Sequence, residues 1–316
     1  MSALIKSFVK QLPHPLVLRI HHYYDLRRKS ALAHAASKIT GLPLLSTLEL
    51  GSIKTSDTVF VLGSGWSINE ISNRRWKAIS LHDSIALNLW PIHPFVPRIY
   101  LFENTNQSEG LIHEAFLGVF QKRAADYREV VKIISEIHSL SAGQLVFEMP
   151  PGFRPNLYVG YSTTIAAQTE REFISGIRYL RGHGIFDPEN HIHWHFKQAG
   201  SVVTAISLAA RMNYRRIVLC GIDLGKAEYF YHHSERYPEA SEWEFTPRDQ
   251  PHLTARRFSW GLPASVVIRH LKQEVLDPAG IELFVENRSS TLFPHIPEIP
   301  PQLFEDLAGA PASAGI

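Results

Sequence analysis

The chain has 316 residues, 45% apolar and 11% aromatic, which is enough to bury a full hydrophobic core and excludes intrinsic disorder. Lysine and arginine number 32 against 30 acidic residues, and a net charge of +2 argues against a dedicated nucleic-acid-binding protein. The single cysteine, Cys220, excludes a disulfide framework and a cysteine-ligated metal cluster, and fits a reducing compartment. Since no run of 18 apolar residues and no signal-peptide pattern occurs, we expect a cytoplasmic protein.

The first 38 residues carry a charge of +6, which leaves −4 for the remainder of the chain. Apolar side chains recur there at helical spacing: Leu4, Ile5, Phe8, Val9 and Leu12. A basic amphipathic segment of this kind can lie on an anionic membrane surface. An ordinary helix packed on the domain is the alternative. Residues 1–38 therefore predict either peripheral attachment to the inner face of the cytoplasmic membrane or a packed helix.

Strands and helices alternate along the rest of the chain. The pattern predicts strands at 58–62, 84–88, 98–102, 216–220 and 281–285, and helices at 111–140, 201–212 and 264–274. This alternation indicates an α/β fold with a mostly parallel sheet and helices on both faces. Residues 150–164 are rich in glycine, proline and tyrosine and predict a loop.

The chain divides into five predicted segments. They are a basic N-terminal extension (1–56), a nucleotide-sugar-binding core (57–224), a lid or acceptor segment (225–258), a return to the core (259–293) and a Pro/Ala-rich tail (294–316). The lid segment is polar and aromatic without clear periodicity, which is typical of functional or mobile loops. We expect the tail to be extended or disordered.

A glycine turn follows the first predicted strand and contains Gly63, Ser64, Gly65 and Ser67. Glycines after a buried strand allow backbone N–H groups to approach a phosphate at a helix N-terminus. The third glycine of the dinucleotide fingerprint is absent, and no Gly-Lys-Ser/Thr follows for a P-loop. The turn therefore predicts a nucleotide-binding site that is neither a dinucleotide fingerprint nor a P-loop. A simple tight turn is the alternative.

Polar residues stand at or just past the ends of other predicted strands: Asn88, Asn104 and Asp223. Binding residues in open parallel sheets gather at these carboxyl ends. An asparagine there can contact a base or a ribose, and Asp223 can accept hydrogen bonds from a hydroxyl or from backbone N–H groups. Each is also a common turn residue.

Aromatic and histidine side chains of the lid segment are further candidates. Tyr229 and Tyr231 can donate hydrogen bonds to an anion. His252 returns toward the core late in the segment and suits general-base catalysis at neutral pH, with His232 and His233 as alternatives. Three other histidines alternate and would share one face of a strand: His191, His193 and His195. Because no further ligand accompanies them, we expect no metal site.

Three blocks together resemble glycosyltransferase family 42, the bacterial sialyltransferases of lipooligosaccharide synthesis. They are Val-Leu-Gly63-Ser-Gly65-Trp-Ser67, Ala-Leu-Asn88, and Ser201…Asn-Tyr-Arg-Arg-Ile-Val-Leu-Cys-Gly-Ile-Asp223…Tyr231. The resemblance extends over about residues 57–292. Its most specific part is the serine, helix and strand that end in Gly-Ile-Asp223, followed by a tyrosine eight positions later.

The resemblance implies a Rossmann-like, GT-A-type fold, a CMP-sugar donor, a glycan or glycolipid acceptor, inversion at the anomeric carbon, and no metal or other cofactor. It also implies homo-oligomers, which the family often forms. Tyr231 would stabilise the departing phosphate and His252 would be the base. Donor contacts would come from the matching turn, asparagine and serine positions: Gly63, Ser64, Gly65, Ser67, Asn88, Asn104 and Ser201.

The chain departs from the family pattern in several places, among them Trp66, where the glycine turn of the family has a proline, and a shorter spacing to His252. Gly225 stands where the family has a second phosphate-contacting tyrosine, and Gln198, next to Lys197, stands where it has an arginine. The donor sugar therefore stays open between sialic acid and a related nonulosonate or Kdo-type sugar. Two other classes also stay open. One is a pterin pyrophosphokinase-like enzyme that uses Mg²⁺ and ATP, and the other is a non-catalytic partner in glycan assembly.

Overall fold

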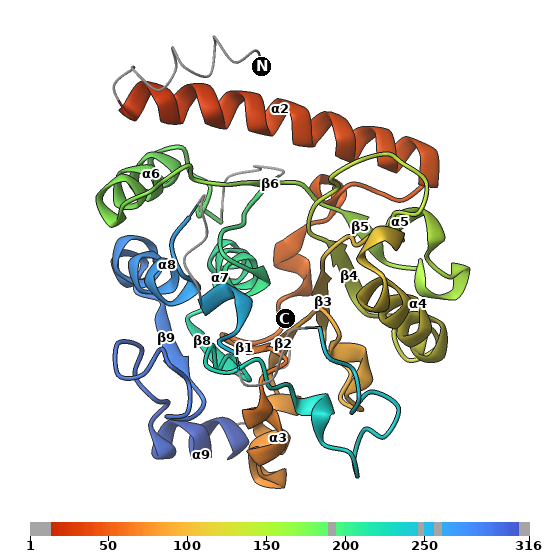
Figure 1. Cartoon of the computed structure of the whole chain (residues 1–316). Helices are drawn as coiled ribbons and strands as arrows, with labels where there is room; N and C mark the ends of the chain where they lie inside the picture. The colour runs from red at the N-terminus through yellow and green to blue at the C-terminus, as the bar shows by residue number, and fades with distance from the viewer. Residues whose placement is uncertain (1–13, 189–193, 246–249, 256–260, 310–316) are drawn as a thin grey trace.

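The computed structural model describes residues 14–188, 194–245, 250–255 and 261–309, and it has an α/β architecture (Figure 1). Seven strands form one sheet in which every neighbouring pair is parallel. Their order is β5 (Leu157–Val159), β4 (Val131–Ile134), β3 (Ile99–Phe102), β2 (Asp83–Leu87), β1 (Thr58–Leu62), β8 (Arg216–Cys220) and β9 (Glu282–Val285). The predicted fold class, an α/β protein with a mostly parallel sheet, is confirmed.

The sheet changes direction beside its first strand. The chain builds outward from β1 to β5 on one side, and β8 and β9 then continue on the other side of β1. Open α/β sheets bind ligands in the crevice at such a switch point, outside the carboxyl ends of the strands. The fold therefore directs attention to the residues that follow β1 and β8.

Helices cover both faces of the sheet. One face carries α6 (Glu170–Gly182), α7 (Ser201–Arg211) and α8 (Ala264–Leu271), and the other carries α3 (Asn73–Ser80), α4 (Leu111–Arg123), α5 (Leu145–Glu148) and α9 (Pro301–Gly309) (Figure 1). Because successive side chains of a strand alternate between faces, Val59 and Val61 join the first core, whereas Phe60 and Leu62 join the second. Strands covered on both sides must be apolar throughout, which explains their continuous hydrophobic runs.

The long helix α2 (His14–Thr40) lies across the outside of the molecule, over α6 at one end and α5 at the other (Figure 1). Its inner side buries Leu18, Ala33 and Ala36. In the described part of the chain, no helix is long and apolar enough to cross a membrane. The apolar residues between 4 and 12 lie outside the described residues.

Two predicted segments near the middle of the chain were wrong. The helix expected over 111–140 ends at Arg123, and the apolar run Val131–Ile134 forms β4 between β3 and β5. The loop expected over 150–164 contains β5 and the short strand β6 (Ser162–Thr163), which pairs with β7 (His195–Phe196). Short apolar runs have no periodicity that separates strand from helix, so only their neighbours in the sheet decide.

The tail was also predicted wrongly over part of its length. Residues 301–309 form α9, which packs on α3 and buries Phe304 and Leu307. Pro301 occupies the first position of this helix, where its missing N–H group costs nothing. Composition predicts an extended tail, but burial of two apolar side chains one helical turn apart stabilises a helix.

Candidate active site

A cavity of about 610 Å³ opens at the switch point between β1 and β8. Its walls come from the turn after β1, the ends of β2 and β3, the start of α7, and parts of segments 221–231, 244–245 and 252–254. Eight of the residues predicted from the sequence line it: Gly63, Ser64, Gly65, Asn88, Ser201, Asp223, Tyr231 and His252. Segments far apart in the sequence thus meet in one cavity.

The turn after β8 approaches the turn after β1 so closely that positions 63 and 65 must be glycine. A Cβ atom on Gly63 would lie 2.6 Å from the carbonyl oxygen of Gly221, and one on Gly65 would lie 2.5 Å from Asp223 Oδ2. Gly221 itself has a φ of +64°. The two turns therefore interlock so closely that no side chain fits between them.

The backbone donors of this turn are largely occupied, which corrects the expectation that they surround a phosphate. The N–H groups of Gly63 and Gly65 donate to the carbonyl oxygens of Cys220 and Gly221, each at 2.8 Å. Among the described residues, the N–H group of Ser64 has no protein acceptor. Of the described turn residues that line the cavity, only Ser64 therefore keeps a backbone donor for a ligand.

Asp223 connects the two turns rather than standing free. Its Oδ1 accepts the hydroxyl of Ser67 at 2.5 Å, and its Oδ2 accepts the backbone N–H of Ser67 at 3.0 Å. Ser67 is buried beneath the cavity and does not line it. Ser67 and Asp223 therefore stabilise the two ends of the switch point, and only Asp223 also reaches the cavity wall.

The two predicted asparagines have different environments. Asn88 lines the cavity at the end of β2 with a φ of +51°, a conformation that asparagine tolerates better than most residues. Its carbonyl oxygen accepts the hydroxyl of Tyr100. Asn104 does not line the cavity, because its amide donates to Gln144 at 2.7 Å and accepts from the N–H of Val146 at 3.0 Å. Asn104 therefore anchors a loop.

Glu103, which the sequence analysis missed, lines the cavity instead. Its Oε1 accepts the Ser201 hydroxyl at 2.8 Å and lies 3.3 Å from the ammonium nitrogen of Lys197. Desolvation raises the pKa of the Glu103 carboxyl, but Lys197 and Ser201 outweigh this effect and hold it below its ordinary value. Glu103 directly follows the predicted strand 98–102, and this position could have identified it as a candidate. It precedes Asn104 by one residue.

The positions that depart from the family pattern have structural roles here. Gln198 accepts the N–H of Ile165 at 3.0 Å, and the carbonyl of Gly225 accepts the N–H of His252 at 2.8 Å. The cation next to Gln198 is Lys197, whose charge Glu103 balances.

Tyr229 and Tyr231 line the cavity as a stacked pair, with ring centroids 5.1 Å apart and planes at 17°. Burial raises the pKa of the Tyr231 phenol well above its ordinary value, and burial also raises the pKa of Tyr229. Both phenols therefore stay protonated at neutral pH. A protonated phenol can donate a hydrogen bond to an anion in the cavity.

His252 lines the cavity next to this pair, with its ring 5.8 Å from that of Tyr229. Burial lowers the pKa of its imidazole, so the ring is neutral at pH 7. The backbone N–H of Thr254 donates to Nδ1 at 3.2 Å, and the Thr254 hydroxyl oxygen lies 2.7 Å from the same atom. Because a backbone N–H only donates, the neutral ring carries its proton on Nε2 in this arrangement.

The other candidate histidines have different environments. His232 Nδ1 accepts the N–H of Tyr229 and its Nε2 lies 2.9 Å from the carbonyl oxygen of Trp243, while His233 stacks on Trp66; neither lines the cavity. His195 is buried in β7, and His191 and His193 lie outside the described residues. Within the described ranges, no group of three or more His, Cys, Asp or Glu side chains is arranged to hold a metal ion.

The fold and the cavity define a doubly wound α/β protein with a cavity at its switch point. No family model and no curated protein sequence matches the chain. Two solved structures from Campylobacter jejuni are similar to it. An α-2,3-sialyltransferase in apo form is 15% identical with a TM-score of 0.40, over 78% of this chain and 80% of that chain. The sialyltransferase CstII in complex with a substrate analogue, cytidine-5′-monophosphate, is 14% identical with a TM-score of 0.37, over 77% and 85%.

Proposed function

We propose that this protein is an inverting, metal-independent glycosyltransferase. It moves a sialic acid, or a related nonulosonate or Kdo-type sugar, from a CMP-sugar to a bacterial surface glycan or glycolipid. The observation that carries the proposal is the convergence of four separate segments on one cavity at the switch point, where they bring together Asn88, Ser201, Tyr231 and His252.

The donor's nucleotide lies along the turn after β1. Asn88 and Ser201 offer an amide and a hydroxyl to its polar edges, and the N–H group of Ser64 is without a protein acceptor among the described residues. The phosphate lies within reach of the Tyr231 phenol, which burial keeps protonated. Donors that are already oriented stabilise a departing phosphate without reorganisation.

The transfer forms a bond between an acceptor hydroxyl oxygen and the anomeric carbon, and breaks the bond from that carbon to the CMP phosphate. His252 takes the hydroxyl proton. In the structure the ring carries its proton on Nε2, so accepting a proton there requires the other tautomer, in which Nδ1–H donates to the Thr254 hydroxyl oxygen that lies 2.7 Å away. The electron pair of the broken bond leaves with CMP.

The acceptor contacts carboxylates that line the cavity. Four carboxylates line the cavity besides Asp223: Glu103, Glu109, Glu228 and Glu244. Ionised carboxylates only accept hydrogen bonds, so a wall of this kind suits a ligand rich in hydroxyl groups. A sugar acceptor has this chemistry.

Nucleotide-dependent thermal stabilisation tests the proposal. CMP without Mg²⁺ is expected to stabilise the protein, by about 2.7 kcal/mol at 100 times its dissociation constant. The measurement is a melting curve with CMP, CDP, UDP and ATP, each with and without Mg²⁺. Stabilisation by ATP only with Mg²⁺ would instead support the pyrophosphokinase-like enzyme. No shift with any nucleotide would support a non-catalytic partner.

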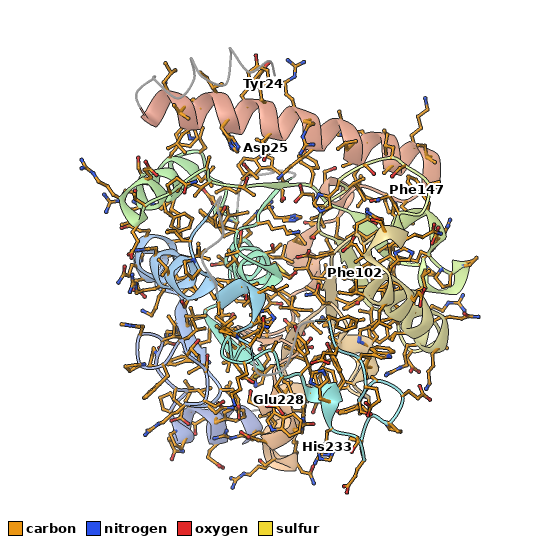
Figure 2. The ribbon with its side chains drawn as sticks, in the orientation of Figure 1. Tyr24, Asp25, Phe102, Phe147, Glu228 and His233 are labelled. Atoms are coloured by element: carbon orange, nitrogen blue, oxygen red, sulfur yellow. The ribbon has the colours of Figure 1, made fainter. Side chains whose placement is uncertain are left out.

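The outer face of α2 supports a second part of the proposal, peripheral attachment to an anionic membrane. Its exposed residues repeat at helical spacing and include no acid: Leu16, Arg19, Tyr23, Tyr24, Arg27, Arg28, Ala31, His34, Lys38 and Ile39. Figure 2 shows Tyr24 on the outer side of the helix and Asp25 on the inner side, where Asp25 pairs with the buried Lys29. Basic and aromatic side chains on one face favour an anionic lipid surface.

We expect Arg28→Glu to weaken binding to vesicles that contain anionic lipid by about tenfold or more, because each basic residue near such a surface contributes about 1 kcal/mol. Vesicle co-sedimentation at low and high salt is the measurement. Lys77→Glu makes the same charge change on an exposed residue of α3 and should bind as the parent protein does. Equal effects of the two substitutions would contradict the role of α2.

A further inference from the structure

A second cavity, of about 520 Å³, is lined in part by Arg236 and Tyr237, which follow Tyr229 and Tyr231 of the first cavity along the chain. Its walls are Asn73, Trp76, His93, Pro94, Phe95, Arg236 and Tyr237. In Figure 1 the cyan segment that follows β8 lies close to α3, the helix that carries Trp76. We call this cavity the aromatic cleft. No residue assigned above to the proposed reaction lines it.

The aromatic cleft is built from rings that stack on one another. The ring of Trp76 lies 4.8 Å from His93 at an interplanar angle of 28°, and 5.3 Å from Phe95. His93 is buried at the bottom, whereas Trp76, Phe95 and Tyr237 are partly exposed. The cleft therefore presents aromatic surface to solvent on a rigid support, because the rings beneath are close-packed.

The charged group that lines the aromatic cleft, the Arg236 guanidinium, only donates hydrogen bonds. Arg236 uses Nη1 to donate to the carbonyl oxygen of Asn69 at 3.2 Å, and among the described residues it has no carboxylate within ion-pair distance. Desolvation, together with the charges of Arg123 and Arg236, lowers the pKa of His93 to about 3, so this ring is neutral. His93 Nδ1 accepts the N–H of Phe95 at 3.1 Å, which leaves the proton on Nε2.

Over the described ranges, Arg236 has more N–H donors free to bind a ligand than Arg123, the other arginine near His93. Arg123 pairs with Asp126 and donates to the carbonyl oxygens of Pro91 and His93, each at 2.8 Å, so it holds the 91–94 loop in place. Arg236 has four further N–H donors and is exposed at the edge of the cleft. In the part of the chain that the structure describes, no acidic side chain lines the cleft. An anion placed here meets a guanidinium without a competing carboxylate.

We propose that the aromatic cleft binds a sugar unit that carries a carboxylate or a phosphate. The C–H face of the sugar ring stacks on Trp76, Phe95 or Tyr237, and its anionic group accepts hydrogen bonds from Arg236. The assignment of this sugar unit to the acceptor glycan rests on the proposed function. The chain links the two cavities, because Tyr229 and Tyr231 line the first and Arg236 and Tyr237 line the cleft.

Direct binding to the full chain, without any nucleotide, tests the proposal. We would measure calorimetric titrations with sialyllactose, which carries a carboxylate, glucose 6-phosphate, which carries a phosphate, and neutral lactose. At least one anionic sugar is expected to bind about ten times more tightly than lactose. The identity of that sugar shows whether the cleft binds a carboxylate or a phosphate. Equal affinity for lactose and both anionic sugars, or no binding of any, would overturn the proposal.

Two variants locate the binding. Arg236→Gln is expected to weaken anionic sugar binding about tenfold, since it removes a charge-assisted hydrogen bond. Trp76→Leu keeps an apolar side chain, removes the ring and should weaken binding of both anionic and neutral sugars. The matched control is Arg128→Gln, an exposed arginine outside the cleft, which should leave affinity unchanged. Equal affinities for Arg236→Gln and Arg128→Gln would also overturn the proposal.

The outcome for the cleft and the outcome for the transferase can be distinguished. Anionic sugars that bind while no nucleotide stabilises the protein would support the aromatic cleft and contradict the transferase. CMP stabilisation without sugar binding would support the transferase and overturn the proposal for the cleft.

Discussion

Replacing His252 with alanine is expected to lower kcat for sugar transfer by about 10²–10⁴-fold, because a positioned general base contributes a factor of this size. Stabilisation by CMP should be retained, since the proposed contacts of the nucleotide come from the turn after β1, Asn88, Ser201 and Tyr231 rather than from this ring. Rates of transfer from CMP-sugars and melting curves with CMP measure the two effects. Loss of CMP stabilisation in this variant would show that His252 binds the nucleotide instead.

Two other variants separate catalysis from folding. His233→Ala changes a histidine of the same segment that stacks on Trp66 outside the cavity, and its kcat should stay close to that of the parent protein. Thr254→Val keeps the backbone donor to Nδ1 but removes the hydroxyl that can accept a proton from it. This variant should lower kcat with little change in KM, and Thr254→Ser should restore the rate.

The pH dependence has a definite sign. Burial lowers the pKa of His252 below the ordinary value of about 6.5, so the ring loses its proton at a lower pH than a free histidine does. Activity that needs the neutral ring should therefore persist below about pH 6.5 and fall only as the pH passes through the lowered pKa. An acid limb of kcat/KM above that value would contradict the assignment.

Gly65→Ala is expected to lower the free energy of unfolding by about 1–3 kcal/mol, the usual cost of adding a methyl group to a close-packed site. The new Cβ would lie 2.5 Å from Asp223 Oδ2 and 2.7 Å from the carbonyl oxygen of Gly221, so the two turns must separate. The hydrogen bonds from Ser67 to Asp223 should weaken as well, and with them CMP stabilisation. Denaturant unfolding and melting curves with CMP are the measurements.

Gly51→Ala is the matched control for this substitution. No atom lies within 4 Å of a Cβ built on Gly51, and its φ is not in the left-handed region. Alanine there should be neutral or stabilise by up to about 1 kcal/mol, because it restricts the unfolded chain. If Gly65→Ala unfolds at the same denaturant concentration as Gly51→Ala, the two turns do not interlock as described.

Much of the sheet follows from local sequence. The four central strands are short apolar runs that end at glycine, asparagine or a charged residue, and such runs must be covered on both faces. Strand β4 was missed because its four residues adjoin a helix of similar composition, and α9 was missed because its prolines suggest an extended chain. In both cases contacts with distant segments outweighed the local signal.

The sequence by itself determined which residues follow the ends of β1, β2 and β8, and hence that polar groups collect at one edge of a parallel sheet. Only the tertiary structure decided how those groups are used. The glycines after β1 admit the turn after β8, and their N–H groups bind its carbonyl oxygens. At the end of β3, Glu103 faces the cavity while Asn104 binds a loop. The reason is physical: hydrogen-bond partners and close contacts come from segments far away in the chain, and local sequence carries no record of which segments those are.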